Sequence, residues 1–162
     1  MIHCVSDLPH EHHYACAAER HFTDADFLRE DGRLPSADYH FGFAVECALK
    51  SLMLRFLGAT MGPKPPKGRL PKAPWILDAG TGKPREFGHL PWLETDLQLL
   101  ASGRSGARLT AVLDGLSAFD SWSVHERYRD GSATEAAAVH SRRTVAQEII
   151  EAHQSALLDG RL

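Results

Sequence analysis

The sequence has few cysteines and no long apolar run. Its three cysteines, Cys4, Cys16 and Cys47, are an odd number and lie far apart, which argues against a disulfide framework and a zinc ribbon. No apolar run approaches the roughly 20 residues that a membrane-spanning helix needs. The opening "MIHCVSDLPHEHH" lacks the basic-then-apolar pattern of a secretory signal. We therefore expect a cytoplasmic protein in a reducing compartment, with no membrane association.

The chain also lacks an excess of positive charge. Its 18 lysines and arginines face 21 aspartates and glutamates, and the formal net charge is −3. No global field therefore attracts it to nucleic acid, although a local basic patch is still compatible with this balance. A length of 162 residues with 43% hydrophobic content is enough for one domain with its own core. We predict a single domain over residues 1–162.

Helical periodicity is the main structural signal. Apolar residues recur at spacings of three and four, and Gly or Pro punctuates the pattern. The last helix is expected to start with a capping box, Ser132-x-x-Glu135, and the third carries Pro91 in its first turn. No internal repeat and no convincing strand pair stands out, so we predict an all-α bundle of about five helices. The expected helices cover residues 9–32, 36–58, 91–103, 105–119 and 132–160.

The composition changes sharply over residues 58–88. This stretch is rich in Gly and Pro, and its six lysines and arginines face only Asp78 and Glu86. We predict a long basic loop inserted between the second and third helices, partly extended as polyproline II, with "PWIL" packing onto the body. "GTGKP" is interpreted as a turn, because it lacks the spacing and the Ser or Thr of a phosphate loop. The loop is the one local feature suited to contact RNA or an acidic partner.

A charged pair stands inside the most apolar segment, "HFGFAVECALKSLMLRF". Glu46 and Lys50 lie on one helical face, about 40° apart at 100° per residue. If exposed, their mutual ion pair adds only a few tenths of a kcal/mol. In a buried helix each charge instead needs a partner, and the candidates are Arg127 and the region of His89. Trp122 and Tyr128 are expected to be core anchors.

Four segments together resemble a known family. "GRLPSADYHFGFAVECALKSLMLRF" resembles the second-helix signature of the HEPN family (higher eukaryote and prokaryote nucleotide-binding domain), an Ala and aromatic entry followed by "A-x-E-x-x-LK-x-L-x". "AERHFTDADFLREDGR" resembles its first helix, and "FGHLPWLETDLQLL" resembles its "GH-x-L" opening of the third. "WSVHERY" resembles its Trp then Arg-Tyr segment before the last helix. The match runs in order from about residue 10 to residue 158.

The resemblance implies a bundle that forms a homodimer through its helices. Some HEPN relatives are metal-independent ribonucleases, often toxins, in which an Arg-x(4–6)-His motif near the last helices faces its copy across the dimer. There the 2′-hydroxyl of the RNA is the nucleophile. Other relatives lack the motif and either accompany a small nucleotidyltransferase as a partner or bind nucleotides. The resemblance thus implies a toxin–antitoxin-like or defence setting.

This chain departs from the ribonuclease pattern. Its only Arg-x(4–6)-His match runs from Arg33 to His40, where Pro35 interrupts it, and lies at the start of the second helix. Near the expected place, His125 precedes Arg127 and no histidine follows at the required spacing. The missing motif favours a non-catalytic module that binds a nucleotide-type ligand or a nucleotidyltransferase partner. The residues predicted to do so are Glu46, Lys50, His89, Arg127 and Tyr128.

Two alternatives remain open. One is a metal-independent ribonuclease of the HEPN toxin type with a rearranged site, whose catalytic candidates are His89, His125 and Arg127. That chemistry needs a histidine that exchanges a proton near neutral pH and an arginine that holds phosphate. The other is a structural dimer in which Glu46 and Lys50 only fix the helix register.

The histidine-rich N-terminal part invites a metal interpretation. His12 and Cys16 are four residues apart and share a helical face, but no defined set of four ligands accompanies them. The only Glu-x-x-His, from Glu86 to His89, lies in a glycine-containing loop rather than on a helix. We therefore predict no metal site and no cofactor. The other residues considered are His3, His10, His13, His21 and Cys4.

Overall fold

The computed structural model describes residues 8–101 and 106–162, and about 62% of the chain is helical. The expected, mainly helical chain is therefore confirmed. Within the described residues, no helix is long and apolar enough to cross a membrane. In chain order the elements are α1 (His10–Glu30), α2 (Leu34–Phe56), β1 (Trp75–Asp78), β2 (Lys83–Glu86), α3 (Glu94–Ala101), α4 (Gly106–Asp114), the 3-10 helices η1 (Gly115–Phe119) and η2 (Val124–Tyr128), and α5 (Ala136–Asp159).

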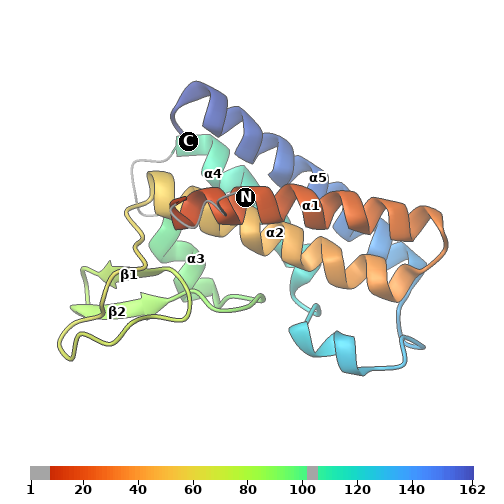
Figure 1. Cartoon of the computed structure of the whole chain (residues 1–162), viewed down its shortest axis with the longest axis horizontal. Coiled ribbons are helices and arrows are strands. Elements are labelled where there is room, and N and C mark those ends of the chain that lie inside the picture. Colours follow the sequence, from red (N-terminus) through yellow and green to blue (C-terminus); the bar gives the residue numbers. More distant parts are fainter. Residues whose placement is uncertain (1–7, 102–105) are drawn as a thin grey trace, which may run out of the picture.

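Helices α1 and α2 form an antiparallel hairpin (Figure 1). Gly32 ends α1 with a φ of 75°, a left-handed conformation that glycine adopts without a Cβ penalty. The Arg33 amide then donates to the Leu28 carbonyl at 2.8 Å and closes the turn. The buried side chains of α1 include Ala15, Ala18 and Ala25, whose small size allows the two helices to approach closely.

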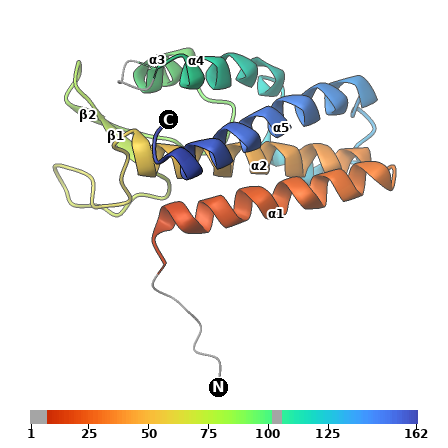
Figure 2. The ribbon, with the colours of Figure 1, turned by 90° about the horizontal axis from the view of Figure 1, so that it is seen from above.

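Helix α2 is the centre of the bundle. Figure 2 shows α1 on one side of α2, and α3 and α4 on the other, beyond α5. The buried residues of α2 lie on almost every side of the helix, as the sequence predicted for a central helix. Trp122 packs so closely on Gly42 that a Cβ there would lie 2.0 Å from the indole, and the Trp122 indole nitrogen donates to the Asp38 carbonyl at 3.1 Å. The prediction that Trp122 is a core anchor is confirmed.

Residues 58–88 contain a β-hairpin, so the expectation of no strand pair is wrong. β1 and β2 pair antiparallel, with Trp75 opposite Glu86. Trp75 and Ile76 are residue types that favour strands, and Asp78 fixes the turn by accepting a hydrogen bond from the Gly80 amide at 2.8 Å. Trp75 is buried, and its indole nitrogen donates to the Gly62 carbonyl at 2.8 Å. Ile76 packs against the hydrophobic core, so "PWIL" contacts the body as predicted, and "GTGKP" covers the hairpin turn and the start of β2.

Acidic side chains organise part of the basic segment. The Glu86 carboxylate pairs with Lys64 and accepts from the Ala73 amide at 2.8 Å. Arg85 pairs with Asp96 of α3. These pairs connect the hairpin to its neighbours and neutralise two of the positive charges. The basic residues still exposed to solvent are Lys67, Arg69, Lys72 and Lys83.

Two predicted helix starts are wrong. α3 begins at Glu94 rather than near Pro91, and the Asp96 carboxylate in its first turn stabilises this start by accepting from the Leu93 amide at 3.2 Å. α5 begins at Ala136, since the Ser132 hydroxyl donates to Asp130 instead of forming the predicted capping box. The predicted break at Gly103 lies outside the described residues.

A buried serine and a buried histidine connect helices α1, α2 and α5 by hydrogen bonds. The Ser51 hydroxyl on α2 donates to the Glu11 carbonyl of α1 at 2.9 Å. Its oxygen lies 3.0 Å from the His153 Nε2 of α5, so Nε2 carries the proton and donates. Burial lowers the pKa of His153, which keeps this ring neutral in the folded state.

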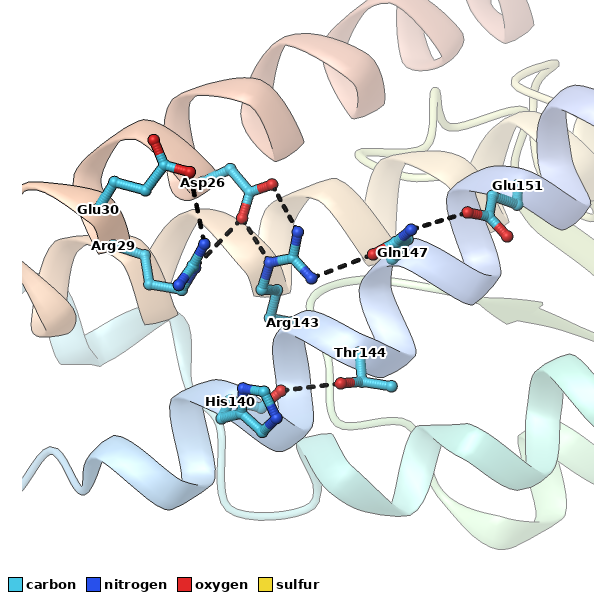
Figure 3. A network of polar contacts seen from close by, with 8 residues as sticks. All are labelled: Asp26, Arg29, Glu30, His140, Arg143, Thr144, Gln147 and Glu151. Carbon is cyan, nitrogen blue, oxygen red and sulfur yellow. Dashed lines mark hydrogen bonds and ion pairs between the residues drawn. The ribbon is translucent and has the colours of Figure 1, made fainter.

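Two adjacent arginines connect α5 to the α1–α2 hairpin in different environments. Arg142 is buried, pairs with Asp38 of α2 and donates through Nε to the Ala118 carbonyl at 2.9 Å. Burial raises the pKa of Asp38, and the Arg142 charge opposes that rise. Arg143 is only half-buried and holds Asp26 of α1 with two bonds, Nε–Oδ1 at 2.6 Å and Nη2–Oδ2 at 3.0 Å (Figure 3).

Substituting each of the two arginines should lower the free energy of unfolding by a different amount. Arg142→Ala leaves the Asp38 carboxylate buried without its partner, and we expect the free energy of unfolding to fall by about 3–5 kcal/mol. Arg143→Ala, its matched neighbour, removes a partly exposed pair and costs about 1 kcal/mol or less. Urea unfolding of both variants measures the difference. Equal losses would contradict the assignment of Asp38 and Arg142 as a buried pair.

Candidate functional site

Four side chains of α2 form one stripe along its length. Tyr39, Phe43, Glu46 and Lys50 are separated by four, three and four residues, the spacing that places them on a single helical face. Tyr39 and Phe43 are partly exposed, whereas Glu46 and Lys50 are 3% and 4% exposed. We call these four residues the α2 stripe. It leads from a surface at the start of the helix to a buried ion pair near its end.

The buried end of the stripe explains the charged pair. Lys50 Nζ lies 2.7 Å from Glu46 Oε1, and the Glu46 Oε2 accepts from the Leu90 amide at 3.1 Å. The Lys50 ammonium also lies 5.8 Å from the centre of the Tyr14 ring. The pair therefore does more than bridge two turns of one helix. Its carboxylate holds the loop between β2 and α3 against α2.

His89, in that same loop, completes the carboxylate's environment. Its Nδ1 lies 3.1 and 3.2 Å from the two carboxylate oxygens of Glu46. Because a carboxylate only accepts, His89 Nδ1 carries a proton and donates it to Glu46, which leaves Nε2 as the nitrogen that Glu46 does not engage. The His89 side chain is 54% exposed, so a buried carboxylate orients an imidazole at the surface.

Aromatic rings continue the surface from His89 toward the start of α2. Phe43 meets His89 edge-on at 5.9 Å between ring centres, and Tyr39 meets Phe43 edge-on at 4.8 Å. The Tyr39 hydroxyl accepts from Arg127 Nη1 at 3.4 Å, and the Arg127 guanidinium lies 4.8 Å from the centre of the Tyr128 ring. We call His89, Phe43, Tyr39, Arg127 and Tyr128 the aromatic face.

The structure brings some of the predicted site residues together and separates others. Glu46, Lys50 and His89 share one cluster, as predicted for the region of His89. Arg127 is not the partner of Glu46, and that prediction is wrong. Arg127 lies in η2, over the first half of α2 at Tyr39, about two helical turns before Glu46.

The remaining candidates lie around the aromatic face. Tyr128 is 74% exposed, so its expected role as a core anchor is wrong, although exposure suits its predicted role in binding. His125 is exposed, with its ring centre 6.5 Å from that of Tyr128. Arg33 is exposed just before α2, whereas His40 directs its Nδ1 to the Nδ1 of His21 at 3.0 Å.

Sequence reasoning missed two groups near this surface. Tyr39 and Phe43 carry the aromatic face, and their four-residue spacing ahead of Glu46 was the available signal. His21 and His40 were not paired, although they lie on the two sides of the turn at Gly32, 11 residues before it and 8 residues after it. In an antiparallel helical hairpin, residues on the facing sides of the two helices come into contact, and here the two rings do so.

No family model, curated protein or solved structure matches this chain. The interpretation of the site therefore depends on the geometry of its own residues.

The pair of Glu46 and Lys50 can be tested with a mutant cycle. Glu46→Leu leaves the buried Lys50 ammonium without its partner, and we expect the free energy of unfolding to fall by about 3–5 kcal/mol. The double variant Glu46→Leu/Lys50→Met removes both charges and should recover part of that loss. Arg129→Ala, which breaks an exposed pair with Glu126, should cost about 1 kcal/mol or less.

Hydrogen exchange separates the loop contact from the ion pair. Glu46→Leu should speed exchange of the Leu90 amide, because the carboxylate is its acceptor. Lys50→Met keeps that acceptor and should change the exchange of this amide much less. Equal acceleration in both variants would mean that the carboxylate does not fix the loop separately.

Proposed function

We propose that this chain is a HEPN-like helical module that binds a nucleotide-type ligand at its aromatic face. The observation that carries the proposal is that an exposed imidazole and an exposed guanidinium, His89 and Arg127, border the same pair of rings, Tyr39 and Phe43. A nucleotide offers the matching chemistry, because its phosphates pair with a guanidinium and its base stacks on aromatic rings.

The charge of Arg127 supports this ligand class. Its contacts are to the side chains of Tyr39 and Tyr128, so no carboxylate among these contacts compensates the guanidinium. Arg129, two residues later, instead pairs with Glu126 at 3.0 Å. Arg127 is therefore the arginine of this segment that is better placed to meet an external anion. Tyr128 adds an exposed ring beside it.

The HEPN resemblance adds two further parts to the proposal. The nucleotide-type ligand would be free or presented by a nucleotidyltransferase partner, and the module would act as a homodimer through its helices. Light scattering of the purified chain measures its oligomeric state directly.

Binding can be tested by calorimetry with ATP, ADP and AMP. Arg127→Ala should weaken binding about tenfold or more, because it removes a charge-assisted contact to phosphate. Arg129→Ala is the matched control and should bind like the parent. Tyr39→Phe keeps the ring and removes the hydroxyl that holds Arg127, so we expect a smaller loss. Equal affinities for all three variants and the parent would exclude the aromatic face as the site.

A ribonuclease is the second candidate, favoured by the contact between His89 and Glu46. A buried carboxylate that fixes the Nδ1 proton of an exposed histidine is the arrangement of a general base. His89 Nε2 would take the proton of an RNA 2′-hydroxyl as that oxygen attacks the adjacent phosphorus, and the 5′-oxygen would leave with a proton from solvent water. Arg127 would hold the phosphate, with His125 as a further candidate.

RNA cleavage in the presence of a chelator distinguishes the two candidates. If the protein is a ribonuclease, the parent cleaves single-stranded RNA, and Arg127→Ala/His89→Ala loses cleavage while keeping its helical circular dichroism. Arg129→Ala is the control and should retain activity. Nucleotide binding without cleavage by the parent supports the non-catalytic module, whereas cleavage that survives the double substitution places the chemistry elsewhere.

A further inference from the structure

Three metal-ligating side chains converge where α1 meets α2. His21 and Asp24 lie three residues apart on α1, and His40 faces them from α2 across the helical hairpin. One potential ligand atom from each residue lies within 4.8 Å of the others. Both histidines are half-buried and Asp24 is exposed, so the group sits at the edge of the interface rather than inside the core.

The spacing of the two histidine nitrogens suits one metal ion. His21 Nδ1 and His40 Nδ1 are 3.0 Å apart. Two nitrogens about 2.1 Å from a common ion and about 90° apart at that ion are separated by about 3.0 Å, and an angle near 109° gives about 3.4 Å. The observed distance therefore matches adjacent positions of an octahedral site and needs only a small shift for a tetrahedral one.

Neighbouring rings hold the two imidazoles in place. His21 lies 5.5 Å from Phe43, and His40 lies 5.6 Å from Tyr39, between ring centres. Imidazoles fixed by these contacts reduce the cost of ordering the ligands.

We propose that His21, Asp24 and His40 bind a divalent first-row transition-metal ion, such as Zn²⁺, Co²⁺ or Ni²⁺. Two imidazoles and one carboxylate are the donor set of facial metal sites, and three protein ligands leave coordination positions open for water or another ligand. The exposed side of Asp24 gives an ion access from solvent. This site goes beyond the sequence prediction of no metal, and it does not rest on the proposed nucleotide binding.

A second metal-binding candidate must be separated from this one. Cys16 Sγ lies 3.5 Å from His12 Nε2 on the exposed face of α1, as the sequence predicted from their spacing. That pair offers two ligands instead of three, and both come from one exposed face of a single helix. It provides the control variant, His12→Ala/Cys16→Ser.

The experiment is a titration of the metal-free full chain with Co²⁺, followed by its visible absorption spectrum, and with Zn²⁺ by calorimetry. We expect one equivalent to bind to the parent and to the control variant. His40→Gln and His21→Gln should each raise the Kd by about a hundredfold or more, since losing even an outer-shell partner costs about 10–100-fold. Asp24→Asn should weaken binding less, because its amide oxygen remains a ligand.

A second measurement does not depend on substitutions. In the parent, paramagnetic Co²⁺ should broaden or shift the NMR ring signals of His21 and His40 before those of His12 and His125. The proposal is overturned if the parent binds no Co²⁺, or if His12 responds first. It is also overturned if the control variant loses binding while the His21 and His40 variants keep it. All these readings are made without nucleotide, so failure here leaves the proposed function independently testable.

Discussion

The position of the surface loop depends on one buried carboxylate. Glu46 is surrounded by apolar side chains on the central helix, where an unpaired charge costs several kcal/mol. Lys50 supplies the opposite charge, and the Leu90 amide and His89 use the remaining acceptor positions. Two of these three donors, the Leu90 amide and His89, belong to the loop, so their bonds to Glu46 fix the loop against α2. The ion pair thus fixes the position of an exposed imidazole relative to the core.

The exposure of the residue stripe on helix α2 changes along the length of the helix. Residues 46–53 are all buried, and Glu46 and Lys50 there face inward. The first half of the helix carries Tyr39, His40 and Phe43, which remain partly exposed. The aromatic face and the proposed metal ligands both begin on these three residues. Two surfaces with different chemistry therefore share one rigid support, and their relative geometry is fixed by the helix.

The sequence predicted the parts of the fold that are governed by local rules. The periodicity of α1 and α2, the turn at Gly32 and the end of α5 at Gly160 all follow from spacing and from glycine's access to positive φ. The hairpin was missed because prolines and basic residues dominate its segment, while the contacts of Trp75 that stabilise it are tertiary. Ser132 was misassigned because its choice between the helix and Asp130 is not encoded in the four-residue pattern.

The candidate site was predictable only in part, for a related reason. The region of His89 could be named as a partner of Glu46 because a buried charge requires one. Which loop covers which turn of α2 is decided by the whole bundle, so Arg127 was paired with the wrong residue. His21 and His40 are 19 residues apart, and only the antiparallel packing of α1 on α2 brings their nitrogens together.

The β-hairpin has a consequence for the protein as an experimental tool. Both ends of the segment are anchored, by the pairing of Thr60 with Trp75 and by the Leu90 amide on Glu46. Its turn, residues 79–82, is exposed. Lengthening a surface loop costs only about 0.6 kcal/mol per doubling. A fluorophore or peptide tag inserted at this turn would therefore leave the aromatic face, the histidines and both chain ends unaltered.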